Sequence, residues 1–88
     1  MSIKKEFPDR IEYWNEKRKL HRLDGPAVEW DYGTKEWYLN GQYHREDGPA
    51  IEWSDGDKEW YINGKRYNSE QEHQQEIIKI KLERLKSL

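Results

Sequence analysis

Histidine, arginine and aspartate recur together at two places in the chain. The string His-Arg-x-Asp occupies residues 21–24 and, 23 residues later, residues 44–47. In phosphoryl-transfer enzymes, a His-Arg-Asp loop works together with a glycine-rich loop and metal-binding residues. Here Leu23 or Glu46 separates the arginine from the aspartate, and the 88-residue chain has neither of these accompanying elements. Because the string occurs once in each copy of a repeat, we predict a structural loop rather than a catalytic one.

The spacing of the histidines does not suit a metal site. His21, His44 and His73 lie at least 23 residues apart, and the chain has no cysteine. Structural zinc sites typically use ligand pairs that are only a few residues apart. The Asp-Gly-Asp string at residues 55–57 is too short for a calcium-binding loop. We therefore expect no metal, no cofactor and no enzymatic activity.

Both His-Arg-x-Asp strings belong to a longer repeat. Residues 20–41 read LHRLDGPAVEWDYGTKEWYLNG and residues 43–64 read YHREDGPAIEWSDGDKEWYING, an ungapped match at an offset of 23 residues. Each copy has two short runs in which apolar or aromatic residues alternate with charged ones, which is typical of β-strands. A turn with a glycine joins the two runs, and an Asn-Gly pair, a strong hairpin signal, follows the second. The sequence therefore predicts a mainly β (α+β) fold, an antiparallel meander of stacked β-hairpin repeats with one C-terminal helix.

The period of two along each strand predicts which residues share a face of the sheet. With four-residue turns at 31–34 and 54–57, the core face holds Val28, Trp30, Trp37 and Leu39, repeated as Ile51, Trp53, Trp60 and Ile62. The opposite face then holds acids and tyrosines: Glu29, Glu36, Tyr38, Glu52, Glu59 and Tyr61. We predict that this acidic aromatic face binds a protein partner, since tyrosine beside charge is common in interfaces. The alternative is that its carboxylates serve only solubility.

The remaining residues complete a single domain over residues 1–88. Residues 1–10 are polar and are interpreted as an N-terminal arm. Residues 11–20 are interpreted as a degenerate half repeat, as expected for the capping unit of a repeat protein. We expect the sheet over residues 11–67, with the two full repeats at about 20–41 and 43–64.

A C-terminal helix is predicted over residues 69–87. Ser69 followed by Glu72 forms a capping box, and neither glycine nor proline follows. The apolar residues cover an arc of about 200°, although packing on one sheet face requires only about 100°. They are Ile77, Ile78, Ile80, Leu82, Leu85 and Leu88. Either the helix lies deep against a twisted sheet, or it makes a second contact through Ile77 and Ile80 with a homodimer partner helix, a bound target or the N-terminal arm.

Charge is unevenly distributed, although the net charge is only −2. Residues 24–63 carry ten acidic and three basic side chains, whereas both ends of the chain are mildly basic. The Lys17–Arg22 cluster lies near Tyr13 and Trp14, and basic groups beside aromatic rings suit single-stranded nucleic acid. A pI near 5.9 argues against nucleic-acid binding, which is kept as an alternative. No apolar run approaches the ~20 residues of a membrane span, and no signal region is present, so we expect a cytoplasmic protein. Contact of anionic lipid with a basic helix face is an alternative that Glu76 and Glu83 disfavour; this face consists of Lys79, Lys81, Arg84 and Lys86.

The repeat resembles two groups of known proteins. A 23-residue hairpin unit with Trp-Tyr, Asn-Gly and a small residue at the next strand start is similar to MORN-type repeats (membrane occupation and recognition nexus). More closely, the HRxDGPA…WYxNG pattern over about residues 12–67 resembles repeat proteins of unknown function from phages and large DNA viruses. The HRxDGPA segment replaces the Gly-x-Gly of the ordinary MORN repeat.

These resemblances imply a non-enzymatic protein-binding module. In the viral case, the implied role is an accessory protein that inhibits a host factor, such as a defence enzyme, in the host cytoplasm. One alternative is a structural protein that forms homo-oligomers, such as a homodimer, through its helix or its sheet edges. The other alternative is the nucleic-acid-binding protein considered above.

Overall fold

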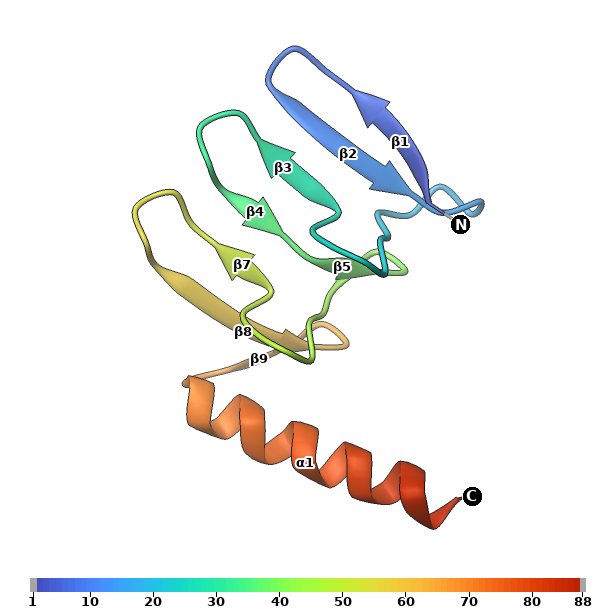
Figure 1. The fold of residues 1–88 in the computed structure, drawn as a ribbon, viewed down its shortest axis with the longest axis vertical. Helices are drawn as coiled ribbons and strands as arrows, with labels where there is room; N and C mark the ends of the chain where they lie inside the picture. The colour runs from blue at the N-terminus through green and yellow to red at the C-terminus, as the bar shows by residue number, and fades with distance from the viewer. Residues whose placement is uncertain (1, 88) are drawn as a thin grey trace.

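The computed structural model describes residues 2–87, in which nine β-strands are followed by one helix. Met1 and Leu88, the outermost residues of the predicted domain, lie outside the described residues. Seven strands form one sheet in the order β1-β2-β3-β4-β7-β8-β9, and β5 and β6 form a separate pair (Figure 1). The strands are β1 (Ile3–Glu6), β2 (Arg10–Trp14), β3 (Val28–Trp30), β4 (Lys35–Glu36), β5 (Tyr38–Leu39), β6 (Gln42–Tyr43), β7 (Ile51–Glu52), β8 (Lys58–Ile62) and β9 (Lys65–Tyr67).

The predicted antiparallel meander is confirmed. Every neighbouring pair of strands in the seven-stranded sheet is antiparallel. Both Asn-Gly pairs take the left-handed backbone conformation, with φ of 51° at Asn40, 83° at Gly41, 49° at Asn63 and 83° at Gly64. A two-residue hairpin turn of type I′ needs positive φ at both positions, which explains why each repeat carries this pair.

The N-terminal segment is a strand rather than the predicted arm. β1 pairs with β2 from Ile3 opposite Trp14 to Glu6 opposite Ile11. The Phe7 amide donates to the Arg10 carbonyl at 2.8 Å and closes the turn between the two strands. All four β1 residues are exposed. An exposed edge strand needs no apolar alternation, so its sequence carried no strand signal.

The pairing within each repeat contradicts the predicted faces. Val28 lies opposite Glu36, and Ile51 lies opposite Glu59, so each pair shares a face of the sheet. The loops that join these strands have three residues rather than four: the Trp30 amide donates to the Thr34 carbonyl at 2.9 Å, and Trp53 is bonded to Asp57 in the same way. A change of one residue in register moves every side chain of a strand to the opposite face. Trp30 therefore shares its face with Glu36, and Trp37 shares the other face with Glu29.

The apolar core is thin and follows the repeat. Its buried members are Ala27, Val28, Ala50, Ile51, Ile62 and Ile77. The tryptophans that were predicted to fill it are half-buried or, for Trp53, 43% exposed. The reason is the register: Trp30 and Trp53 lie on one face of the sheet and Trp37 and Trp60 on the other, so the four indoles cannot pack together in one layer.

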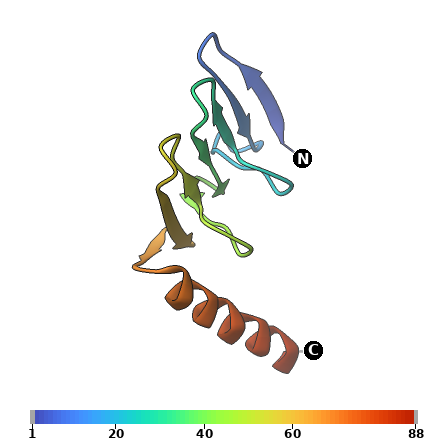
Figure 2. The ribbon, with the colours of Figure 1, turned by 60° about the vertical axis from the view of Figure 1, so that its left-hand side comes forward.

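The predicted C-terminal helix is confirmed as α1 (Glu70–Lys86). The Ser69 hydroxyl accepts from the Glu72 amide at 3.2 Å, and the Glu72 carboxylate accepts from the Asn68 amide at 3.2 Å. α1 packs against β8 and β9, on the same side of the sheet as the two His-Arg-x-Asp loops (Figure 2). Within residues 2–87, no helix has the length and apolar character needed to cross a membrane.

Candidate functional site

The face of the sheet opposite α1 and the two His-Arg-x-Asp loops carries carboxylates that accept hydrogen bonds from aromatic side chains, and we call it the carboxylate face. It comprises Glu12, Glu36 and Glu59 with Trp14, Trp30, Trp53, Tyr38, Tyr43 and Tyr61. At its centre, the Trp30 indole donates to Glu36 Oε2 at 2.6 Å. The Tyr38 and Tyr43 hydroxyls donate to Glu36 Oε1 at 2.8 and 3.0 Å. Three neutral donors therefore fix both oxygens of one carboxylate.

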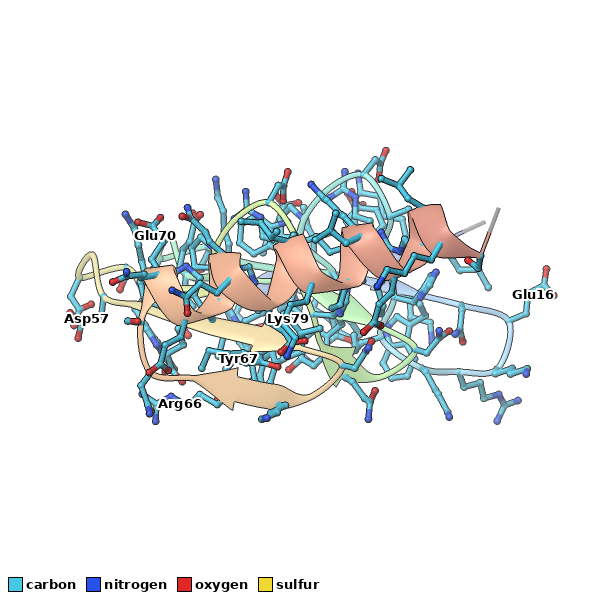
Figure 3. All side chains as sticks on the ribbon, turned by 90° about the horizontal axis from the view of Figure 1, so that it is seen from below. Glu16, Asp57, Arg66, Tyr67, Glu70 and Lys79 are labelled. Carbon is cyan, nitrogen blue, oxygen red and sulfur yellow. The ribbon has the colours of Figure 1, made fainter. Side chains whose placement is uncertain are left out.

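The second repeat builds the same arrangement around Glu59, with one change. The Trp53 indole donates to Glu59 Oε2 at 2.7 Å, and the Tyr61 hydroxyl donates to Oε1 at 3.1 Å. The residue 23 positions after Tyr43 is Arg66, whose Nε lies 3.8 Å from Glu59 Oε1. Figure 3 shows Arg66 on the side of β9 that faces away from α1. A cation therefore replaces one phenol at this carboxylate.

The first hairpin supplies a third carboxylate that also has a cation. Glu12 accepts from the Trp14 indole at 2.9 Å and from Arg10 Nε at 2.6 Å. Glu36 differs from both neighbours, because it forms no ion pair with any residue in 2–87. The centre of the carboxylate face is thus a negative charge that only neutral donors hold.

The tyrosines around Glu36 are stacked and stay protonated. The ring centroids of Tyr38 and Tyr43 are 4.5 Å apart, and those of Tyr43 and Tyr61 are 4.9 Å apart. Burial is the main cause that raises the pKa of all three, and the nearby carboxylates raise the pKa values further. Because the hydroxyls keep their protons, they remain donors at neutral pH.

Aromatic rings border Glu36 where a partner can reach them. Tyr32 is 59% exposed and stacks on Trp30 at a centroid distance of 5.6 Å, and Trp53 lies in the next repeat. The chain already places its own cations on such rings: Lys5 Nζ lies 4.6 Å from the Trp14 ring, and the Arg10 guanidinium lies 5.4 Å from the Trp30 ring. The face can therefore hold cationic side chains by ring contact as well as by charge.

Four of the six predicted partner-binding residues lie on this face: Glu36, Tyr38, Glu59 and Tyr61. The other two, Glu29 and Glu52, are on the opposite face, because the three-residue loops reverse the predicted register. Sequence reasoning missed Trp30 and Trp53 for the same reason, and it missed Tyr43 because it did not consider the pairing of Tyr43 with Tyr38 across the Asn40-Gly41 turn. The missed signal is the glycine at the third loop position, with φ of 106° at Gly33 and 97° at Gly56, which is typical of a three-residue hairpin loop.

On the opposite face, each His-Arg-x-Asp string holds its own loop in place. The Arg45 guanidinium lies 3.8 Å from the Trp37 ring and donates to Asp47, to the Pro49 carbonyl and to Glu52. Arg22 makes the equivalent contacts with the Tyr13 ring, Asp24, the Pro26 carbonyl and Glu29. The histidines reach into the next turn, where His21 Nδ1 accepts from the Asn40 amide at 3.0 Å and His44 Nδ1 accepts from the Asn63 amide at 2.9 Å.

A groove of about 470 Å³ lies between these two loops, above Trp37 and Leu39. Its histidine, His44, is poorly placed to act as a base. Nδ1 accepts the backbone bond from Asn63, and Nε2 lies 3.5 Å from a carboxylate oxygen of Glu46. In residues 2–87, no group of three or more His, Cys, Asp or Glu side chains is arranged to hold a metal ion.

The Lys17–Arg22 cluster does not form a stacking surface. Arg22 covers the Tyr13 ring on one face, and Lys5 lies over the Trp14 ring on the other. Both rings that were expected to stack on bases are therefore already in contact with cations of this chain.

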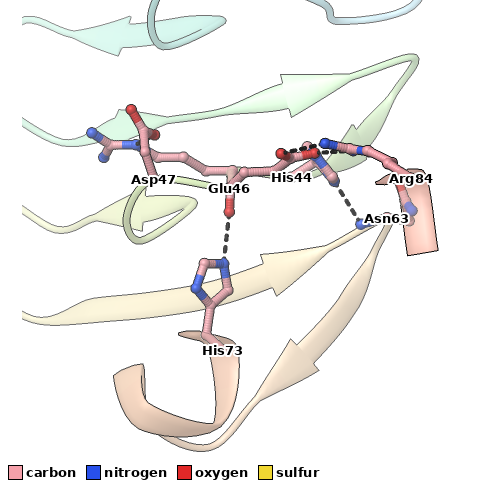
Figure 4. Close-up of polar contacts among 7 residues, drawn as sticks. His44, Glu46, Asp47, Asn63, His73 and Arg84 are labelled. Atoms are coloured by element: carbon pink, nitrogen blue, oxygen red, sulfur yellow. Dashed lines mark hydrogen bonds and ion pairs between the residues drawn. The ribbon is translucent and has the colours of Figure 1, made fainter. Parts of the chain in front are cut away.

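At the end of the sheet, α1 is bonded to the second His-Arg-x-Asp loop (Figure 4). His73 is only 1% exposed, and its Nε2 lies 2.6 Å from the Arg45 carbonyl. Both terminal nitrogens of Arg84 donate hydrogen bonds to the Glu46 carboxylate, Nη1 to Oε1 at 3.1 Å and Nη2 to Oε2 at 2.7 Å. This contact is the main cause that lowers the Glu46 pKa. Two polar contacts to one loop therefore fix the direction of the helix across the sheet.

The helix residues predicted to meet a partner, Ile77 and Ile80, turn toward the sheet instead. Ile77 is 5% exposed and Ile80 is half-buried. The sheet therefore occupies the position that a partner would need at both residues. The exposed apolar residues of α1 are Ile78, Leu82 and Leu85.

Comparison with known proteins adds no family assignment. No protein-family model, no curated protein and no solved structure matches this chain.

Proposed function

We propose that this protein is a non-enzymatic binding module whose carboxylate face recognises a basic segment of a partner protein. The observation that carries the proposal is the Glu36 carboxylate, which is held by three neutral donors and has no cation of its own within residues 2–87. An arginine or lysine from a partner would supply the missing counter-charge. Charge-assisted hydrogen bonds are about twice as strong as neutral ones, so this contact favours a cationic segment over a neutral one.

The aromatic surroundings support the same partner chemistry. The Trp30 ring already contacts Arg10 and Tyr32. The exposed Trp53 ring is therefore the one that a partner guanidinium would contact, and a cation–π contact adds about 0.5–2 kcal/mol. Arg10 and Lys5 already make such contacts within the chain. The excess of acids over bases in residues 24–63 also favours the approach of a basic surface.

The wider role follows from the resemblance to repeat proteins of phages and large DNA viruses. We propose an accessory protein that occupies a basic surface of a host factor, such as the nucleic-acid groove of a defence enzyme. If reversing the charges of Glu36 and Glu59 leaves every host-protein interaction unchanged, this wider role is wrong.

A peptide titration tests the binding chemistry directly. A fluorescently labelled hexa-arginine peptide would be titrated with the wild-type protein and with Glu36→Gln, which removes the charge but keeps an acceptor for the aromatic donors. Glu52→Gln is the matched control, because it removes one acid of the same sheet from the opposite face. We expect about tenfold weaker binding for Glu36→Gln only, as loss of about 1.4 kcal/mol implies. An equal loss of peptide affinity in both variants would show that the peptide is bound by non-specific charge attraction.

A further inference from the structure

Helix α1 presents a narrow apolar stripe on its outer side. Ile78, Leu82 and Leu85 are 58%, 54% and 65% exposed, and their spacing of four and then three residues aligns them along the helix. The sheet-facing side of α1 is a different stripe, which contains His73 and Ile77. Figure 3, which views the molecule from below, shows α1 nearest the viewer with no strand or loop in front of it. The outer stripe therefore has no partner within residues 2–87.

We infer that this stripe is a docking surface for an acidic amphipathic helix of a partner protein. Spacing of four and three residues is the pattern of core positions in a coiled coil, which pack as knobs into the holes of one facing helix. The stripe is only three residues long, so it suits a contact with a helix that is itself anchored in a folded partner.

The charges beside the stripe indicate that the partner helix carries negative charge. At 100° per residue, Lys81 borders the stripe on one side, and Lys79 and Lys86 border it on the other. Glu76 and Glu83 lie beyond these lysines and closer to the sheet, with the Glu76 carboxylate 3.8 Å from Lys79 Nζ. The residues that flank a coiled-coil core select the partner through charge, and here all three are basic.

The same lysines disfavour a second copy of this chain as the occupant. In a parallel pair of α1 helices, Lys81 would face Lys86 of the other copy. In an antiparallel pair, Lys81 would face its own equivalent and Lys79 would face Lys86. Like charges in these flanking positions oppose pairing in both orientations.

A membrane surface is also a poorer fit than an acidic helix. Helices that lie in the membrane interface have a strongly charged face on one side and a broad apolar face, often with aromatic residues, on the other. Here the sheet already covers Ile77 and part of Ile80, the outer stripe is one residue wide, and α1 contains no aromatic residue besides His73. The stripe therefore matches the width of one helix rather than that of a lipid surface.

A designed peptide provides the test, independently of the carboxylate face on the other side of the sheet. The probe is a labelled four-heptad peptide with leucine at the core positions and glutamate at the flanking positions. The control peptide carries lysine at the flanking positions. We expect the acidic peptide to bind at least tenfold more tightly than the basic one, and to bind less tightly as salt is added.

Two variants of the full chain locate the contact. Ile78→Gln/Leu82→Gln should weaken binding of the acidic peptide about tenfold or more, because it removes two apolar side chains that the contact would bury. Leu23→Gln, which changes a 79% exposed leucine in the first loop, should leave the affinity unchanged. Circular dichroism of each variant checks that the fold is retained.

Several results would overturn the inference. They are no binding of the acidic peptide up to about 1 mM, equal binding of both peptides, or binding that the stripe variant does not weaken. A wild-type dimer that becomes monomeric in the stripe variant would identify the occupant as a second copy. Stripe-dependent binding to vesicles of anionic lipid, without binding to the peptide, would identify it as a membrane. Because Glu36→Gln leaves the helix intact, failure of either proposal is distinguishable from failure of the other.

Discussion

Replacing Glu36 by alanine measures how strongly the carboxylate face holds the sheet together. The substitution leaves the Trp30 indole and the Tyr38 and Tyr43 hydroxyls without their acceptor. A hydrogen bond to a charged group contributes about 1.5–3 kcal/mol, so three of them set an upper limit of about 4.5–9 kcal/mol. Glu36 is half-buried, and water can replace part of what is lost. We therefore expect the free energy of unfolding to fall by about 3 kcal/mol, a large part of the stability typical of a chain this size.

The matched control is Glu52→Ala on the opposite face. Glu52 accepts one charged bond, from Arg45 at 2.9 Å, and its side chain is 36% exposed. Partly exposed ion pairs contribute about 1 kcal/mol or less. Urea unfolding of both variants, followed by tryptophan fluorescence, compares the two losses. If both variants lose the same free energy of unfolding, water replaces the hydrogen bonds that the aromatic donors make to Glu36. The carboxylate face would then not stabilise the sheet as described.

Three further predictions concern the packing of α1 through His73 and the dependence of stability on pH. His73→Ala should lower the free energy of unfolding, measured in urea, by about 2–3 kcal/mol, because it creates a cavity and leaves the Arg45 carbonyl without a hydrogen-bond partner. The matched control is Gln74→Ala at an exposed position of the same helix, which should change the free energy of unfolding by less than about 0.5 kcal/mol. The three stacked tyrosines have raised pKa values in the folded protein, so stability should be fully present below the unfolded pKa of about 10 and should fall as pH rises above it. A flat profile from pH 9 to 11 would contradict this burial. Arg84 lowers the Glu46 pKa, so the contribution of this pair is present above about pH 4.3 and lost as pH falls further. The protection of α1 amides from hydrogen exchange, taken relative to the intrinsic exchange rate at each pH, should therefore fall in acid, and Glu46→Gln should remove that pH dependence.

The repeat made much of the fold predictable from the sequence. Two ungapped copies, each ending in Asn-Gly, predict where the chain turns within each repeat, and Ser69 predicts the start of the helix. These features are local, since each depends on a few neighbouring residues with a specific backbone conformation. β1 was missed because it is an exposed edge strand without an apolar pattern, and no copy of it occurs elsewhere in the chain.

The faces of the sheet were harder to predict, because they depend on a difference of one residue in loop length. A loop of three residues rather than four places Trp30 beside Glu36 and moves Glu29 to the other face. In the helix, the residues of the wide apolar arc are divided between a side that meets the sheet and an exposed side. The arc alone does not show which side meets the sheet; the contacts of His73 and Arg84 with a single loop decide that Ile77 is buried and Ile78 is exposed.

The indole N–H signals in a two-dimensional ¹H–¹⁵N NMR spectrum test the central proposal most directly. A basic peptide that binds the carboxylate face should shift the signals of Trp30 and Trp53, whose indoles donate to Glu36 and Glu59. The signal of Trp60 should stay in place, because this indole nitrogen is buried on the helix side of the sheet. Shifts of Trp30 and Trp53 that disappear in Glu36→Gln are the predicted result. A shift of Trp60 alone, or of no indole at a peptide concentration that saturates binding, would contradict recognition through this face.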